Sequence, residues 1–443
     1  MWKAAFFFLA STAWAQTPLS LKDAVRLALA GNPAMAAAAE SSRAARAQVD
    51  AARSGRLPKL NYSESWVRSD NPVFVFSSLL TQHQFGPENF AINTLNRPGF
   101  LNNFQSLVTL NQPIYDGGQT RHAVKAAELG RQMTDEEKRR VQMELVAGAA
   151  RAYYGAILAG DNLKAAEQAV RSAEADLTRA ESIHAAGMST EVDVLSIRVH
   201  LAAVNEERIQ RAAQLDVARA ALNDVLGLEL DTPHQLTTPL TAAETPDESL
   251  ADAESGAAQE RPEMRESRLN SLLARNQVDT ARTSLRPEVG LLGAFEADRQ
   301  DFVTKGGANW TAGISMKWNL FNGLSDKARI EAAAAGVRRA DAETRRADSA
   351  VRLQVRQAWA DLRAAEQRIE VAKASVAEAE ESLRITQNRY EAGMSNVTDL
   401  LRTETAVLES RTRYLAAVHD QRVAAIQLEL AAGKLSANSE VLN

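Results

Sequence analysis

Alternating apolar and polar residues predict β-strands in two regions of the chain. Between Trp310 and Leu320 every second residue is apolar, which is the period of a strand. A weaker alternation surrounds Tyr62 and Leu110. We therefore predict two hairpins, whose four strands cover about 58–67, 105–115, 287–296 and 309–320.

The strand over 309–320 has one strongly apolar face. Trp310, Ile314 and Trp318 lie on that face, whereas Ser315 lies on the polar one. An outer-membrane strand needs this arrangement, because one face meets lipid and the other lines water. A soluble sheet with one buried face shows the same alternation. We predict that the three apolar residues contact lipid.

Most of the remaining chain predicts long helices. Residues 118–185 contain no proline and are rich in strong helix formers. Apolar residues recur there, and again over 369–383, at steps of three and four, which is typical of coiled-coil seams. The spacing resumes at Val194 after a short turn, so each region is expected to form an antiparallel helical hairpin. The seam residues of the first region are Leu163, Ala166, Val170, Ala173, Leu177 and Ala180.

The chain contains an internal duplication. The turn segment Ala186-Gly187-Met188-Ser189 recurs as Ala392-Gly393-Met394-Ser395, an offset of 206 positions. The preceding helix and strand repeat at an offset of 229, as from Leu57 to Arg286. The longer offset indicates an extra connection in the first copy, and its prolines and glycines over 72–99 predict an irregular loop. The predicted divisions are 1–15 signal peptide, 16–227 first repeat, 228–260 linker, 261–435 second repeat and 436–443 tail, with turns at 186–190 and 392–396.

Composition excludes several function classes. The 443 residues carry 51 basic and 56 acidic side chains, a net charge of −5, which does not favour nucleic-acid binding. With no cysteine, disulfides, thiol nucleophiles and a lipidated amino terminus are ruled out. No phosphate-binding loop, serine elbow or metal-ligand spacing occurs. We expect no enzymatic activity, no cofactor and no metal; the six scattered histidines are His83, His122, His184, His200, His234 and His419.

The first fifteen residues predict a secretory signal peptide. Lys3 precedes an apolar run from Ala4 to Ala10, and Ala13-Trp14-Ala15 forms a small-residue cleavage pattern. No later run of eighteen apolar residues predicts a transmembrane helix. The protein is expected to be exported, and to be either soluble or an outer-membrane β-barrel.

The number of strands predicts an oligomer. Four strands per chain cannot close a membrane barrel, because such barrels start at about eight strands. Two chains would give a barrel filled by side chains, whereas three chains would give about twelve strands and an open lumen. The expected fold is mainly α with membrane β: a homotrimer whose twelve-stranded barrel continues into a periplasmic α-helical tunnel.

These features together resemble the TolC-type outer-membrane efflux and secretion channels. The likeness extends from Leu21 to Leu435 and rests on the duplication, on both turn segments, and on two junctions. Residues 112–118 read Gln-Pro-Ile-Tyr-Asp-Gly-Gly, and 318–323 read Trp-Asn-Leu-Phe-Asn-Gly. Residues 71–76 also resemble an outer loop of some members. The resemblance implies a homotrimeric conduit that docks onto an inner-membrane pump through a periplasmic adaptor (membrane fusion) protein.

The resemblance also implies roles for residues near the turns. The rim that meets the adaptor corresponds to Ala186, Gly187, Met188, Ser189, Ala392, Gly393, Met394 and Ser395. The gate that closes the periplasmic end corresponds to Asp193, Tyr390, Asp399 and Arg402. Ser395 stands where the family has an arginine, and Arg402 where it has an acid. Asp193 follows Thr190 at capping-box spacing, so helix capping is the competing interpretation.

A soluble periplasmic coiled-coil scaffold or adaptor is the alternative function. It would share the helices and the signal peptide. It would not need two strand hairpins with tryptophan on one face, nor a full duplication. The sequence does not identify the exported cargo, and the channel interpretation is the one we carry forward.

Overall fold

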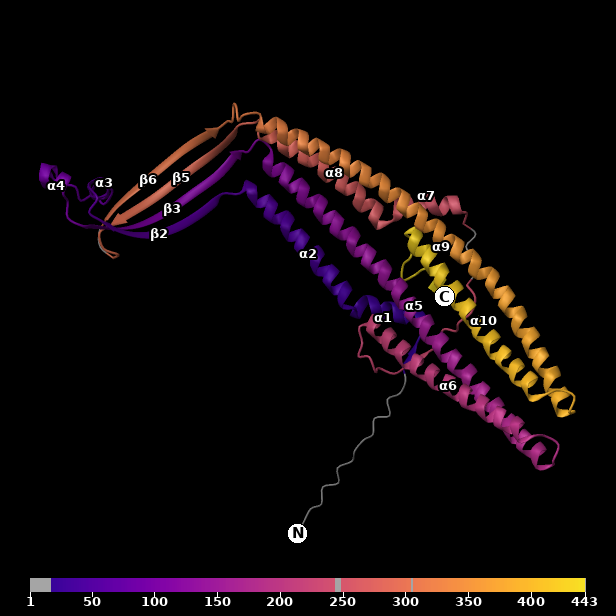
Figure 1. Ribbon diagram of the computed structural model, residues 1–443. Helices are drawn as coiled ribbons and strands as arrows, with labels where there is room; N and C mark the ends of the chain where they lie inside the picture. The colour runs from indigo at the N-terminus through magenta and orange to yellow at the C-terminus, as the bar shows by residue number, and fades with distance from the viewer. Residues whose placement is uncertain (1–16, 244–247, 304–305, 443) are drawn as a thin grey trace, which may run out of the picture. The chain divides into compact units, whose positions relative to one another are not determined.

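The computed structural model describes residues 17–243, 248–303 and 306–442. The predicted signal peptide, 1–15, lies outside the described residues. The chain is predominantly helical, with one four-stranded sheet and one two-stranded sheet among the described residues (Figure 1). No helix in these ranges combines the length and apolarity needed to cross a membrane.

The predicted duplication is confirmed by the helices. The first copy contains α5 (Gln119–Ala185) and α6 (Glu191–Leu226), and the second contains α9 (Ser325–Glu391) and α10 (Val397–Ala432). Both long helices have 67 residues and both shorter helices have 36. Shorter helices precede the strands of each copy: α2 (Pro33–Arg53) and α8 (Pro262–Thr283).

The four-stranded sheet is antiparallel with strand order β2-β3-β5-β6. One cross-strand row joins Tyr62, Val108, Phe295 and Trp310, so large apolar residues share one face along the whole row. The strands are β2 (Lys59–Ser69), β3 (Leu101–Tyr115), β5 (Glu288–Arg299) and β6 (Gly306–Lys317).

The predicted extent of the last strand is wrong at its end. The β5–β6 ladder stops at the pair Glu288–Lys317, because the residue before Glu288 is Pro287, which has no N–H to continue the ladder. Trp318 therefore lies just beyond β6. Its ring N–H donates to the backbone carbonyl of Leu285 at 3.1 Å.

The composition predicts an irregular loop between β2 and β3, but this connection contains helices. It contains α3 (Pro72–Thr81), a 3₁₀ turn at Pro87–Phe90 and α4 (Ile92–Asn96). The Asn71 side chain caps α3 by accepting from the N–H groups of Val73 and Phe74, and Pro72 occupies the first helical position, which it favours. The loop composition concealed a capped helix.

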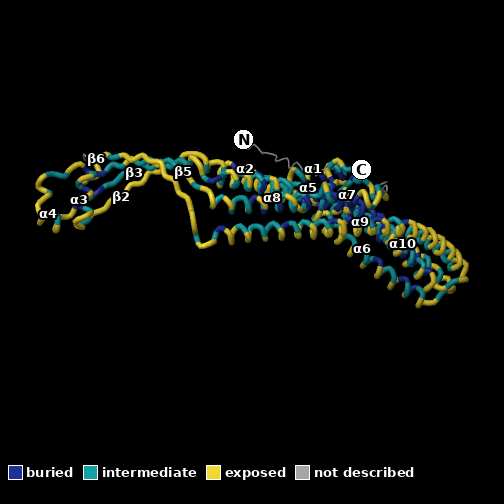
Figure 2. Tube along the Cα trace, turned by 90° about the horizontal axis from the view of Figure 1, so that it is seen from above, coloured by how far each residue is buried: buried dark blue, intermediate teal, exposed yellow. Residues whose placement is uncertain are grey.

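The described residues divide into two compact units. The unit formed by segments within 17–41, 134–267 and 344–442 contains the larger buried core. This core joins α1 (Leu21–Gly31) to the middle of α5 and the end of α6, and buried positions are visible near α5 in Figure 2. Within the hairpins, the predicted seam residues Ala166, Ala173 and Ala180 are fully buried.

The predicted linker over 228–260 is structured. Its β4 (His234–Leu236) pairs in parallel with β1 (Thr17–Leu19), and α7 (Leu250–Glu260) follows. The fully buried Tyr153 hydroxyl donates to the Leu19 carbonyl at 2.8 Å and accepts from the N–H of Thr238 at 2.9 Å. Tyr153 therefore fastens this segment to α5.

Candidate functional site

The two turns that end the long helices have the same backbone geometry. Gly187 and Gly393 both have a φ of +73°, the left-handed conformation that favours glycine. The next N–H, of Met188 or Met394, donates back to a helix carbonyl at 3.0 or 2.8 Å, which completes a Schellman motif. These bonds satisfy the helix ends without help from other parts of the chain.

Both turns present their predicted contact residues to the outside. Met188 is 74% and Met394 66% exposed, and the alanine and glycine of each turn are exposed as well. Ser189 and Ser395 are half-buried. A Cβ added at Gly187 or Gly393 would meet no atom within 4 Å. The two turns therefore form open surfaces made of small residues and one flexible methionine each.

Asp193 caps its own helix. Its carboxylate accepts from the backbone N–H of Thr190 at 3.0 Å, while the Thr190 side chain accepts from the N–H of Asp193, which is a capping box. Asp399 occupies the equivalent position on α10, where Asn396 is the capping residue and accepts from the Asp399 N–H at 2.8 Å. Capping accounts for the spacing of both aspartates.

The predicted gate residues are not joined into a lock within one chain. Tyr390 is half-buried against Ala180, Val194 and Val397, and no hydrogen bond connects it to Asp193 among the described residues. Burial raises the pKa of Tyr390, and the nearby charge of Asp193 adds to the rise. Arg402 is exposed on α10.

A buried charged cluster lies close to these residues, and the sequence reasoning missed it. Asp176 of α5 is only 3% exposed and Glu404 of α10 only 9%. His200 of α6 places its Nε2 3.3 Å from Oε2 of Glu404. Arg179 of α5 lies 3.3 Å from Asp176 and 3.1 Å from Glu391 of α9. The cluster therefore draws on all four hairpin helices.

The two buried carboxyls respond to each other. Burial, and then the facing Glu404 carboxyl, raise the pKa of Asp176 to about 8, although Arg179 opposes the rise. Burial also acts to raise the pKa of Glu404, but bonding to His200 and Asp176 outweighs it and lowers that pKa. Near neutral pH, Asp176 is accordingly the protonated member of the pair and Glu404 the charged one.

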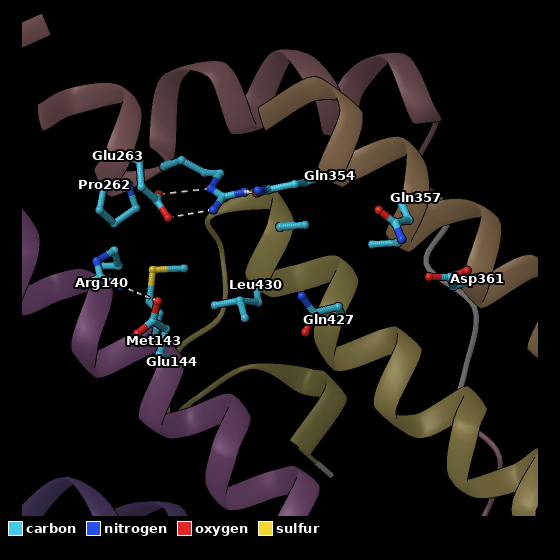
Figure 3. Close-up of a pocket in the computed structure, with 13 residues that line it drawn as sticks. Arg140, Met143, Glu144, Pro262, Glu263, Gln354, Gln357, Asp361, Gln427 and Leu430 are labelled. Carbon is cyan, nitrogen blue, oxygen red and sulfur yellow. Dashed lines mark hydrogen bonds and ion pairs between the residues drawn. The ribbon is translucent and has the colours of Figure 1, made fainter. Parts of the chain in front are cut away.

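Two cavities lie among the helices of this unit. A groove of about 830 Å³ is lined by His200, Glu404, Leu383 and residues along the same helices. A cavity of about 380 Å³ is lined by Arg140, Glu144 and Gln427, with the Glu263 carboxylate held by Arg261 at its rim (Figure 3). Beside the smaller cavity Arg140 pairs with Glu144 at 2.6 Å, and beside the groove Arg211 pairs with Glu207 at 2.7 Å.

The apolar face of the sheet carries Trp310 and Ile314, two of the three residues predicted to contact lipid, whereas Trp318 lies just beyond β6. Trp310 is 79% and Ile314 73% exposed in the single chain. The same face also carries an ion pair, in which Arg299 at the end of β5 lies 2.9 Å from Glu64 midway along β2. Trp66 stacks on Phe104 beside this pair. Alternation alone did not reveal that charged residues share the apolar face.

Comparison with known proteins identifies the family. The model of the family described as "outer membrane efflux protein" matches residues 24–228 and 255–434. These residues make up most of the chain and include both helical hairpins. The chain belongs to the outer membrane efflux protein family. Its members are outer-membrane channels that serve efflux and secretion, so the channel interpretation is confirmed over the soluble scaffold.

Individual relatives align with this chain over most of its length. Protein CyaE of Bordetella pertussis is 29% identical over 77% of this chain and 73% of its own. The proteases secretion protein PrtF of Dickeya chrysanthemi is 24% identical over 94% of this chain and 89% of its own. The CmeC outer membrane channel of Campylobacter jejuni has the same fold, with a TM-score of 0.79 at 17% identity over 100% of this chain and 95% of its own.

Proposed function

We propose that this outer membrane efflux protein is a homotrimeric conduit that docks with a periplasmic adaptor protein and an inner-membrane pump. It is exported by its signal peptide and inserted in the outer membrane, and no nucleic acid takes part. The observation that carries the proposal is an open four-stranded sheet whose two edge strands have no partner in the described chain.

The open sheet favours assembly with further copies. Edge strands β2 and β6 have 11 and 12 residues, and each leaves a row of backbone N–H and C=O groups unpaired on its outer side. Long unpaired edges are avoided in isolated proteins, because they pair with other chains. Three copies supply the twelve strands that close a barrel with a lumen, and each β2 then pairs with the β6 of a neighbour.

The face that carries Tyr62, Phe295 and Trp310 supports contact with outer-membrane lipid. Burying such a row in lipid removes large apolar area from water. The ion pair between Arg299, which ends β5, and Glu64, midway along β2, lies beside Trp66 and Phe104. Aromatic residues concentrate at the membrane–water interface of barrels, where a charged pair also retains water.

The two exposed turns support docking onto an adaptor. Their helix ends are satisfied internally and their side chains are small, so a partner helix can approach the backbone closely. We assign the adaptor-contacting surface to the two turn segments, 186–189 and 392–395. The cargo class that we favour is protein, because the match to PrtF, which is named for protease secretion, spans 94% of this chain.

The test combines cell fractionation with an export assay in the source organism. The mature protein is expected in the outer membrane, with the native mass of a trimer in mild detergent. Gly187→Arg with Gly393→Arg is expected to abolish export and leave the trimer intact, while Val303→Arg, at a 90% exposed position of the β5–β6 connection, is the control that retains export. A soluble periplasmic monomer would refute the proposal.

A further inference from the structure

The proposed docking of the two turns does not involve the buried cluster around Asp176. Its four helices belong to two hairpins, α5–α6 and α9–α10 (Figure 1), and the cluster lies beside the apolar contact of Ala180, Ile197 and Val397 that joins the hairpins. The charged contacts of the cluster therefore join the same two hairpins.

Two charged contacts across the hairpins belong to this cluster. Arg179 joins α5 to Glu391 of α9, and His200 joins α6 to Glu404 of α10. Oδ2 of Asp176 and Oε1 of Glu404 are buried and have no hydrogen-bond partner among the described residues, whereas Oε2 of Glu404 faces Nε2 of His200. Two ionised carboxylates in that position would be strongly unfavourable, whereas one proton held between them satisfies both groups.

We infer that Asp176, Glu404 and His200 form a proton-dependent latch that holds the two hairpins of one chain together near their tips. With a proton on Asp176, that carboxyl donates to Glu404, whose charge faces His200. Loss of the proton places two negative charges in a buried site and drives α10 away from α5. The groove beside His200 and Glu404 provides space into which the helices can rearrange.

The direction of the pH effect follows from the proton count. The pKa of Asp176 is about 8 in the closed arrangement, against an ordinary value of 3.8, so closing takes up a proton between these limits. The closed arrangement is therefore most favoured at low pH and weakens as the pH rises toward about 8. One proton changes the ratio of closed to open chains by up to about tenfold per pH unit.

The neighbouring charges are accounted for on each helix. The positive charge of Arg179 on α5 lowers the pKa of Asp176. Glu391 on α9 raises that pKa and also pairs with Arg179. Tyr390 on α9 also faces Asp176, and Asp193 on α6 faces Tyr390. His200 on α6 acts on Glu404. Variants of Asp176, Glu404 and His200 separate the contributions of these side chains.

The distance between the hairpin tips reports on the latch directly. Because the chain has no cysteine, Met188→Cys and Met394→Cys carry the only thiols, and spin labels there give the tip separation by pulsed electron paramagnetic resonance. Trimers are assembled with excess unlabelled chain, so that each contains one labelled copy. The tip separation is expected to be longer at pH 8.5 than at pH 6.5.

Charge variants identify the titrating group. Asp176→Asn, which stays neutral and can still donate to Glu404, is expected to keep the short distance at both pH values. Glu174→Gln, at an exposed position two residues earlier on α5, is the control that retains the shift. Should Asp176→Asn fail to assemble, Glu404→Gln removes the other carboxyl and makes the same test. His200→Gln is expected to retain a pH-dependent distance.

Three results would overturn the latch: a distance that is equal at both pH values, a shift that survives in Asp176→Asn and Glu404→Gln, or a shift abolished by His200→Gln alone. Its consequence for transport rests on the proposed function, and conductance in planar bilayers separates the two. A pH-dependent distance without any conductance contradicts the conduit and supports the latch. Conductance without a distance change contradicts the latch and supports the conduit.

Discussion

Two adjacent tyrosines on α5 provide a matched test of how the segment after α6 is held. Tyr153 and Tyr154 are both completely buried, but only Tyr153 has a bonded hydroxyl. It donates to the carbonyl of Leu19 and accepts from the N–H of Thr237 and of Thr238. The Tyr154 hydroxyl has no hydrogen-bond partner among the described residues. Removing the two hydroxyls should therefore have different effects.

The size of the Tyr153→Phe effect follows from the contacts that remain. The N–H of Thr237 still donates to the Leu19 carbonyl at 3.1 Å, so the substitution leaves one donor, the N–H of the half-buried Thr238, without its partner. An unsatisfied buried donor costs about 1–3 kcal/mol. If the cost falls on local opening of this segment, opening becomes roughly 5- to 150-fold more frequent.

Hydrogen exchange measured by mass spectrometry on peptides covering 228–243 detects this change. Tyr153→Phe is expected to accelerate amide exchange there and to leave the exchange of α9 unchanged. Tyr154→Phe removes a hydroxyl that is buried without a partner, so exchange is expected to stay the same or slow down. Equal exchange in both variants, or faster exchange in Tyr154→Phe, would refute this account of the core.

Three further substitution tests follow from the same structure. Gly227→Ala should prevent stable assembly, since its Cβ would lie 2.5 Å from a backbone carbonyl oxygen, whereas Gly187→Ala meets open space and should cost about 1 kcal/mol of backbone strain; heat resistance of the trimer compares them. Ile314→Arg should reduce membrane insertion by about 2–4 kcal/mol per chain, and Ser315→Arg on the other face should be tolerated, as urea titration of refolded protein would show. Asp193→Ala should lower the stability of α6 by about 0.5–1.5 kcal/mol through the lost capping-box hydrogen bond from the Thr190 N–H, measured by proteolysis near the turn.

The long helices could be predicted because their evidence is local. Apolar steps of three and four, the absence of proline and a glycine at each turn all lie within the segments they describe. The duplication then doubled the evidence, since Gly187 and Gly393 carry the same turn. The sheet was predictable for the same reason, through the alternation around Trp310 and Ile314.

Features that depend on distant packing could not be predicted. Asp176, His200 and Glu404 look like ordinary polar helix residues, and only the meeting of four helices buries them together. The strand β4 has three residues, which is too short for a periodic pattern to predict it. Tyr153 holds the residues that follow it. The helix α3 was concealed because prolines and glycines flank it, although Asn71 followed by Pro72 is a capping signal that could have found it.

Crosslinking between edge strands tests the trimeric conduit most directly. Single cysteines are placed at Ser63 or Ser65 on β2 together with Thr311 or Ser315 on β6, in a chain that otherwise has no cysteine, and oxidised in outer membranes. Disulfides form only when the two Cα atoms lie within about 7 Å. The account predicts that at least one pairing gives covalent dimers and trimers and no larger species. Monomers in every pairing, or a ladder extending beyond the trimer, would contradict it.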